Sequence, residues 1–213
     1  MSQLEATITL LQGTSNRGIR SENAKLQLTM TRLLAKGAPV SAQALAQALG
    51  EPVEFVSTAF QQLQRGGCEF NERGELIGSA LTLTPTRHRL EVDGTPLYAW
   101  CALDTLFLPA YIGKPAQVSS TCPQTHTTIS LTVTPHRVET VVPDEAVVSI
   151  MTGKGCTAGI EGTFCGQVHF LSSREAAEQW INSRPDFTIL TVAEAYQLAD
   201  EVYIQPILKY HAQ

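Results

Sequence analysis

The chain has 213 residues, of which 43% are hydrophobic and 16% are charged, a composition typical of a folded globular protein. Its formal net charge of -5 and its pI of ≈ 5.5 are opposite to those of a surface that neutralises phosphates, so nucleic acid is not an expected partner. No apolar run approaches the length of a membrane span, and we expect no membrane partner.

The cysteine count and the first residues indicate a compartment. The five cysteines are an odd number without the spacing of a disulfide framework, which favours free thiols. Residues 1–5 lack the basic region that opens a secretory signal. Free thiols persist in reducing compartments, and we therefore expect a cytoplasmic protein.

The first third of the chain has a helical pattern. Apolar residues recur at helical spacing between residues 4 and 11 and again between 26 and 34. Ser41 is placed to cap a third helix that Gly50 ends, and Pro52 to open a fourth that stops at Gly66. A hairpin is then predicted for 68–84, with its turn at residues 71–74.

Two short helices followed by a hairpin resemble a winged helix–turn–helix, a unit that often binds DNA. The helix that would enter the major groove, 52–64, carries Glu54 and has no Lys or Arg before Arg65. Such a helix normally brings cations to phosphates and donors to bases. We therefore interpret this unit as a packing module rather than a DNA reader.

The rest of the chain mixes strands and helices. Strands are predicted at 81–84, 90–92, 117–119, 129–133, 146–150 and 164–170, with a helix between the second and third that begins near Cys101 and that Pro109 ends. Two further helices open with capping-box patterns at 172–175 and 191–194. The expected fold class is α+β, with a winged-helix-like helical module (1–80) packed on a mixed α/β catalytic domain (81–213) that has a mostly antiparallel sheet.

The stretch 98–106 places a thiol and a carboxylic acid three residues apart, so that Cys101 and Asp104 share one helical face. One interpretation is a small buried cysteine and a capping aspartate. The other is chemical: apolar neighbours would raise the pKa of Asp104 and make it a proton donor, while the positive end of the helix would favour the thiolate of Cys101. The residues alone leave both open.

The other cysteines differ in context. If 164–170 is a strand, Cys165, Gln167 and His169 share one face of it. For Cys68, Cys122 and Cys156 we favour structural or incidental roles. His169 could orient a site, although a satisfied core histidine is the favoured interpretation, and His126 has no evident partner.

Other sites built on thiols fit less well. A structural zinc site usually contains a close Cys–x–x–Cys pair, and none occurs. A cysteine protease would pair Cys101 with a histidine, which the sequence does not exclude but which leaves Asp104 without a role. The glycines at 153 and 155 form no P-loop because the Gly–Lys–Ser/Thr ending is missing.

Several motifs together resemble the organomercurial (alkylmercury) lyases. The stretch 97–106, followed by Pro–Ala at 109–110 and Ile–Gly at 112–113, is similar to the signature of that family. Residues 164–170 are similar to its second cysteine motif, and 118–122 with 130–133 to the segment between. The helical first third, including 33–41, is also similar, so that the resemblance covers almost the whole chain.

The resemblance implies protonolysis of a carbon–mercury bond, which gives a hydrocarbon and Hg(II). It implies that Cys101, Asp104 and Cys165 are catalytic and that all three hold mercury, the two cysteines as thiol ligands and Asp104 as the residue that also handles the proton. It also implies a structural role for Cys122 and a winged-helix-like module that does not read DNA. One departure is that many members have Cys–His directly after the second catalytic cysteine, where this chain has Gly166 and Gln167.

The expected partners follow from that activity. We expect an organomercurial substrate, low-molecular-weight thiols that supply and clear the metal, and a hand-off of Hg(II) to a mercuric reductase. No organic cofactor is expected, since mercury is substrate and product. The alternatives are a mercury- or thiol-reactive sensor that binds DNA, which would need a basic recognition helix, and a structural zinc protein.

Overall fold

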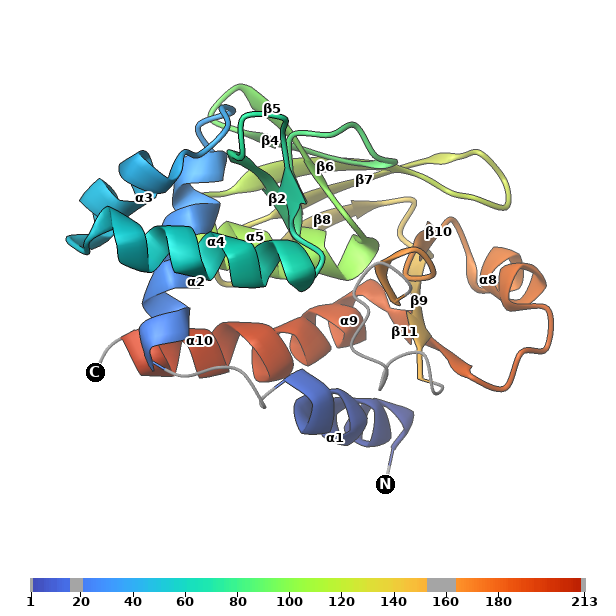
Figure 1. Ribbon diagram of the computed structural model, residues 1–213. Coiled ribbons are helices and arrows are strands. Elements are labelled where there is room, and N and C mark those ends of the chain that lie inside the picture. The colour runs from blue at the N-terminus through green and yellow to red at the C-terminus, as the bar shows by residue number, and fades with distance from the viewer. Residues whose placement is uncertain (1, 16–20, 153–163, 212–213) are drawn as a thin grey trace.

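The computed structural model describes residues 2–15, 21–152 and 164–211. A large sheet covers one side of the molecule, a layer of helices lies below it, and a small sheet stands at one end (Figure 1). Helix α5 (Ala102–Ile112) lies between these layers, because it contacts strands of the large sheet on one side and the C-terminal helices on the other. The fold therefore places the beginning of α5 in the centre of the molecule.

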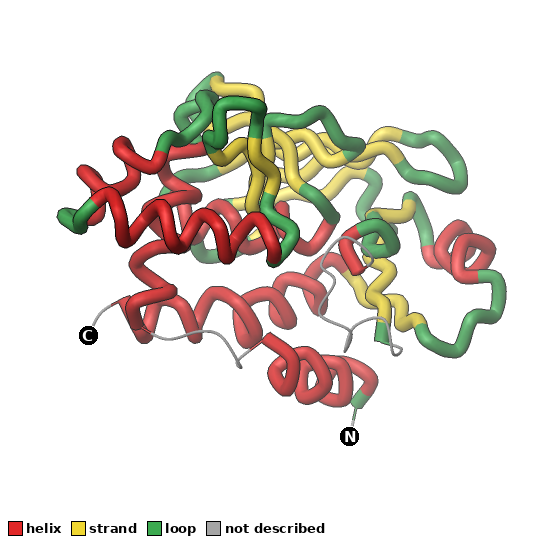
Figure 2. Tube along the Cα trace, in the orientation of Figure 1, coloured by secondary structure: helices red, strands yellow, loops and turns green. Residues whose placement is uncertain are grey.

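The remaining helices within the described residues come before and after this central helix in the chain, and Figure 2 shows helices in red. They are α1 (Gln3–Ser15), α2 (Ser21–Leu34), α3 (Ala42–Leu49), α4 (Val53–Arg65), α8 (Arg174–Ile181), α9 (Val192–Ala199) and α10 (Gln205–His211), with a π-helical turn η1 (Asp200–Ile204) between the last two. Ser41 caps α3 by accepting a hydrogen bond from the amide of Ala44, and Gly50 ends it at φ 71, as predicted.

The strands confirm the predicted α+β class with a mostly antiparallel sheet. The large sheet has the order β1-β2-β3-β5-β4-β6-β7-β8, and the small one β10-β9-β11. The bounds are β1 (Glu69–Phe70), β2 (Leu76–Ser79), β3 (Leu81–Thr82), β4 (His88–Val92), β5 (Thr95–Ala99), β6 (Ala116–Thr121), β7 (Thr128–Val133), β8 (Val138–Val142), β9 (Val147–Met151), β10 (Phe170–Leu171) and β11 (Phe187–Thr191). Every pairing between the named strands is antiparallel.

Three local predictions are wrong. Pro109 lies inside α5, which ends only at Gly113 in the left-handed conformation; all of 102–111 is buried, and this packing offsets the one hydrogen bond that a proline removes. The expected strand 164–170 is instead helical at 164–165 and a turn at 166–167, with only its last residue in β10. Helix α8 is capped by Ser173 rather than Ser172, so that Glu175 cannot close the predicted box.

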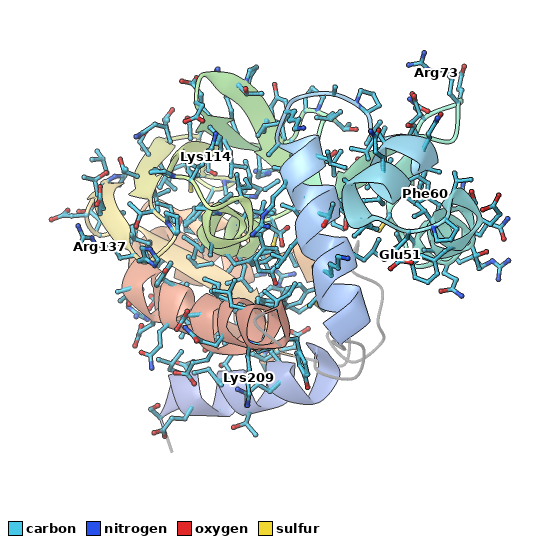
Figure 3. The ribbon with its side chains drawn as sticks, turned by 90° about the vertical axis from the view of Figure 1, so that its left-hand side faces the viewer. Glu51, Phe60, Arg73, Lys114, Arg137 and Lys209 are labelled. Atoms are coloured by element: carbon cyan, nitrogen blue, oxygen red, sulfur yellow. The ribbon has the colours of Figure 1, made fainter. Side chains whose placement is uncertain are left out.

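A continuous apolar core runs from α1 through the sheets to α10. Strands β1 and β2, which precede residue 80, extend the same sheet as β3–β8; the division into modules 1–80 and 81–213 stays a prediction. The ion pairs of the described residues lie at the surface, where they add little stability. Figure 3 shows two of their members, Arg73 and Arg137, at the periphery. No helix within the described ranges is long and apolar enough to cross a membrane.

Candidate active site

The site begins where β5 ends and α5 starts. Cys101 has an extended backbone (φ -145, ψ 172) and occupies the N-cap position, and its N–H donates to Asp104 Oδ2 at 2.9 Å. The amide of Asp104 in turn faces the Cys101 side chain, which completes a capping box. The same local geometry that starts the helix therefore fixes the thiol and the carboxylate side by side.

Cys165 approaches this pair from a distant part of the sequence. Its thiol donates to Asp104 Oδ2 at 3.9 Å. The ligand atoms of Cys101, Asp104 and Cys165 all lie within 4.8 Å of one another. The three side chains are 0%, 6% and 8% exposed, respectively. The predicted site residues thus converge in a nearly dry cluster of two sulfurs and one carboxylate.

A backbone hydrogen bond joins the two segments of the site. The N–H of Ala102, the first residue of α5, donates to the carbonyl of Val168 at 3.1 Å. This donor belongs to the first turn of the helix, where no intrahelical acceptor exists. The segment that follows Cys165 therefore satisfies the beginning of α5 and holds the two cysteines together.

The electrostatics of the site differ from the expectation for Cys101. Burial raises the pKa of the Cys101 thiol well above its usual value, and the hydrogen bond with Cys165 and the negative charge of Asp104 act in the same direction. The opposing hydrogen bond from the Asp104 amide is weaker. The prediction that the helix end makes Cys101 a thiolate is therefore wrong: the resting residue is a neutral thiol.

The other cysteines that the structure describes lie apart from this cluster. Cys68 is half-buried, just before β1, and Cys122 is buried at the end of β6. Although burial alone would raise the pKa of Cys122, hydrogen bonds from Thr125 and the neighbouring backbone lower it. Cys156 lies outside the described residues. None of the four described cysteines forms a disulfide.

Two histidines lie together behind the site, and the sequence pointed to only one of them. His169 is buried, as favoured, and its ring is hydrogen-bonded to His88, which was not singled out. A signal for His88 was available, because it begins the inward face of β4 with Leu90 and Val92. His126 is exposed and directly follows a turn. A histidine at an inward strand position needs polar partners, and His88 finds them in His169 and Ser120.

The donor set of the site suits a soft metal. Thiolates are the softest ligands of proteins and select thiophilic ions, whereas a lone carboxylate adds charge and a proton store. Two sulfurs and one acid around a buried point could therefore bind such a metal and transfer a proton next to it. A four-ligand structural zinc site would need a further donor, and the cluster found among the described residues has three members.

Comparisons with known proteins agree with this chemistry. The model of the alkylmercury lyase family matches residues 81–204. An alkylmercury lyase of Staphylococcus epidermidis is 45% identical over 169 residues, which cover 79% of this chain and 77% of the relative. One of Streptomyces lividans is 44% identical and covers 85% and 83%, respectively. One of Bacillus cereus is 40% identical over 198 residues and covers 92% and 89%.

The fold is also similar to a solved structure. The crystal structure of the mercury-bound form of MerB2 matches with a TM-score of 0.71, and the match covers 97% of this chain and 100% of that chain. The sequence identity of the match is 22%, so this likeness supports the fold.

Proposed function

The chain belongs to the alkylmercury lyase family and is a carbon–mercury lyase that acts on organomercurials, and we propose that Cys101, Cys165 and Asp104 carry out the reaction. Cleavage by protonolysis gives a hydrocarbon and Hg(II). The observation that carries the proposal is the convergence of two thiols and one carboxylate within 4.8 Å in a buried cluster. Each of the three groups has a separate task in this chemistry.

The two thiols are needed because one does not weaken the bond enough. The substrate arrives as R–Hg bound to a small thiol, and exchange gives R–Hg–S(Cys101) while the small thiol leaves with the proton of Cys101. A second thiolate on the metal raises electron density on mercury, so that the bound carbon becomes more basic. Soft sulfur ligands favour this step.

Asp104 supplies the proton, acting first as a base and then as an acid. Its Oδ2 accepts from the thiol of Cys165, which is the geometry for taking that proton as Cys165 binds mercury. The protonated carboxyl then delivers the same proton to carbon as the carbon–mercury bond breaks. The products are R–H and Hg(II) held by two cysteine sulfurs, and the carboxylate is regenerated.

The neutral state of Cys101 fits this sequence. A buried thiolate next to Asp104 would be costly, whereas a neutral thiol loses its proton only in exchange for a metal. The site is therefore at rest without substrate, and two anionic sulfurs appear only when a cationic metal compensates them.

The remaining expectations complete the proposal. Two small thiols would clear Hg(II) from the two cysteines and return both to the protonated state. We expect a hand-off of that Hg(II) to a mercuric reductase, no organic cofactor, and a cytoplasmic location, since the reaction needs free thiols. No helix in the ranges that the structure describes could span a membrane.

The test uses phenylmercury and headspace detection of benzene in the presence of excess small thiol. Cys101→Ala, Cys165→Ala and Asp104→Asn should each lower turnover by at least about 100-fold, as expected for groups that act as a unit. The matched control is Cys68→Ala, which removes a thiol outside the cluster and should keep turnover near that of the wild type. Full activity in any one of the three variants would remove that residue from the mechanism.

The sensor alternative makes a different prediction. It requires a complex with DNA, but α4 offers Glu54 in its first turn and a single cation, Arg65, in its last. The family to which the chain belongs consists of enzymes, and the alternative is not favoured. A gel shift at moderate salt without a complex would agree with the lyase.

A further inference from the structure

Hydrogen bonds that its backbone carbonyls accept hold the turn that carries Cys165. Three successive carbonyls accept hydrogen bonds: Gly166 from Nε2 of His169 at 3.0 Å, Gln167 from Oγ of Ser149 at 3.0 Å, and Val168 from the amide of Ala102 at 3.1 Å. The donors come from the chain after the turn, from β9 and from α5. Such convergence is unusual for a turn, because most turn carbonyls face water.

The bond to Gly166 is the end of a longer buried chain. Nδ1 of His169 lies 3.4 Å from Nε2 of His88, and Nδ1 of His88 lies 2.9 Å from Oγ of Ser120. The two imidazole planes are 14° apart. His88 and Ser120 face each other across the β4–β6 register, so the large sheet supports the chain from behind.

The chemistry of the groups gives this chain one direction. The carbonyl of Gly166 only accepts, so Nε2 of His169 must carry hydrogen. In a neutral ring Nδ1 of His169 is then an acceptor, and His88 must donate to it from Nε2. Nδ1 of His88 is in turn an acceptor, and the hydroxyl of Ser120 donates to it.

Burial keeps both rings neutral, which this order requires. It lowers the pKa of His88 well below its usual value, aided by His169 and Arg87. Burial, with a contribution from the positive charge of Arg87, also lowers the pKa of His169 to about 4, although the bond to Gly166 opposes the shift. Each ring therefore has one donor and one acceptor near neutral pH, and each of them has a partner.

We propose that His169, supported by His88, is a positioning residue of the lyase reaction: its hydrogen bond to Gly166 holds the Cys165 turn so that the thiol of Cys165 faces Asp104. The proposal rests on the proposed function, because it concerns the second thiolate of that mechanism. The capping box that orients Cys101 is formed at the start of α5 and does not include the bond to Gly166. Loss of the bond should therefore affect the step after the first capture of mercury.

Two substitutions separate the hydrogen bond from the bulk of the ring. In His169→Gln the amide nitrogen takes the place of Nε2 and can still donate to Gly166. In His169→Asn the shorter amide reaches only the place of Nδ1, so that the carbonyl of Gly166 loses its donor. The control is His136→Asn, which changes an exposed histidine in the loop between β7 and β8.

The readouts are kcat and KM for benzene release from phenylmercury, with excess small thiol. We expect His169→Asn to lower kcat by about 10–100-fold, the usual effect of losing a supporting hydrogen bond behind a metal ligand. KM should change little, because capture by Cys101 is unaffected. His169→Gln should stay within about threefold of the wild type, and His136→Asn should equal it.

A second readout follows the turn itself. The rate at which iodoacetamide modifies Cys165, measured by mass spectrometry of its peptide, should change in His169→Asn and be restored in His169→Gln. Should the Asn variant fail to fold by circular dichroism, Ser149→Ala takes its place, because it removes the bond to the neighbouring carbonyl of Gln167 together with the acceptor of the His169 amide. That variant should also lower kcat with KM preserved.

The outcomes distinguish this proposal from the proposed function. Equal losses in the Gln and Asn variants, an unchanged kcat in the Asn variant, or a parallel rise in KM would overturn the positioning role. A fully active Cys165→Ala variant would instead overturn the proposed function, whatever the histidine variants do. An inactive Cys165→Ala together with the expected Gln and Asn results supports both.

Discussion

The indole Nε1 of Trp100 donates a 2.9 Å hydrogen bond to Oε1 of Glu69, so that the residue next to Cys101 is held by a carboxylate on β1. The other oxygen of Glu69 accepts hydrogen bonds from the hydroxyls of Thr82 and Thr84. One side chain on β1 therefore connects β3 and the bend after it to the segment that opens the site. We therefore predict that a substitution that displaces Glu69 also disturbs the segment that contains Cys101.

Gly78→Ala should displace Glu69 without changing a polar group. A Cβ at Gly78 would lie 2.3 Å from Oε2 of Glu69 and 2.9 Å from Oγ1 of Thr82, closer than real side chains approach. We expect a loss of about 1–3 kcal/mol in the free energy of unfolding, as for other overpacked sites. Urea denaturation measures this loss, and the fluorescence of Trp100 should shift as its acceptor moves.

The matched control is another glycine-to-alanine change. Gly13 lies in α1, and a methyl group added there would meet no atom within 4 Å, so Gly13→Ala should gain about 0.5–1 kcal/mol from helix propensity. If both substitutions changed the free energy of unfolding by the same amount, the Glu69 carboxylate would be moving aside without a loss of stability.

Asp104→Asn should make Cys101 easier to ionise. The negative charge of Asp104 is one of the causes that raise the pKa of this thiol, and the amide removes the charge while its oxygen can still accept from the Cys101 N–H. The alkylation of Cys101 by iodoacetamide should therefore set in at lower pH in the variant than in the wild type. Mass spectrometry of the peptide that contains Cys101 measures this, and the same midpoint in both proteins would contradict it.

The buried histidines predict how stability depends on pH. The pKa of His169 is about 4 in the folded chain and about 6.5 when unfolded, so between these values the unfolded state binds more protons. Stability from this group is therefore present above pH 6.5 and is lost as the pH falls towards 4. Between pH 7 and pH 5, the titration of His169 should lower the free energy of unfolding by about 2 kcal/mol.

His169→Gln isolates this effect, because the amide does not titrate but keeps the bond to Gly166. The difference in urea midpoint between pH 7 and pH 5 should be smaller in His169→Gln than in the wild type. Carboxylates contribute equally to both proteins and cancel in the comparison. An undiminished pH dependence would mean that His169 is not kept neutral by the fold.

The sequence predicted those parts of the site that are local. Cys101 and Asp104 could be paired because a helix N-terminus brings residues three apart together. The approach of Cys165 depends on tertiary contacts with α5, and the turn at 166–167 forms because carbonyls there find donors in other elements, which no strand periodicity reveals. The neutral state of Cys101 was missed for the same reason, since burial is a property of the packed molecule.

The fold shows the same division. Caps and turns such as Ser41, Gly50 and the box at Thr191 were predicted correctly because their hydrogen bonds lie within four residues. Strands β5, β8 and β11 were not predicted. β8 is an edge strand with no buried residue, so it lacks the apolar alternation by which strands are found.

Ala102→Pro should disconnect the two cysteine segments while sparing the helix. Proline is favoured at the first helical position, and Cys101 already has the extended backbone that a following proline requires. The substitution removes the N–H that donates to Val168 and puts a ring carbon in its place, which pushes the Cys165 turn away. We expect turnover of phenylmercury to fall by about 100-fold, since misplacement by an ångström has such an effect.

The control for this change is Ala102→Ser, which keeps the N–H and should retain most of the activity. Because α5 still forms in Ala102→Pro, its far-UV circular dichroism should match that of the wild type, and Cys101 should still bind phenylmercury without cleaving it. Mass spectrometry of the intact protein would detect that adduct, which carries the mass of one phenylmercury group. Normal turnover in Ala102→Pro would mean that the bond between Ala102 and Val168 is not what brings Cys165 to Asp104.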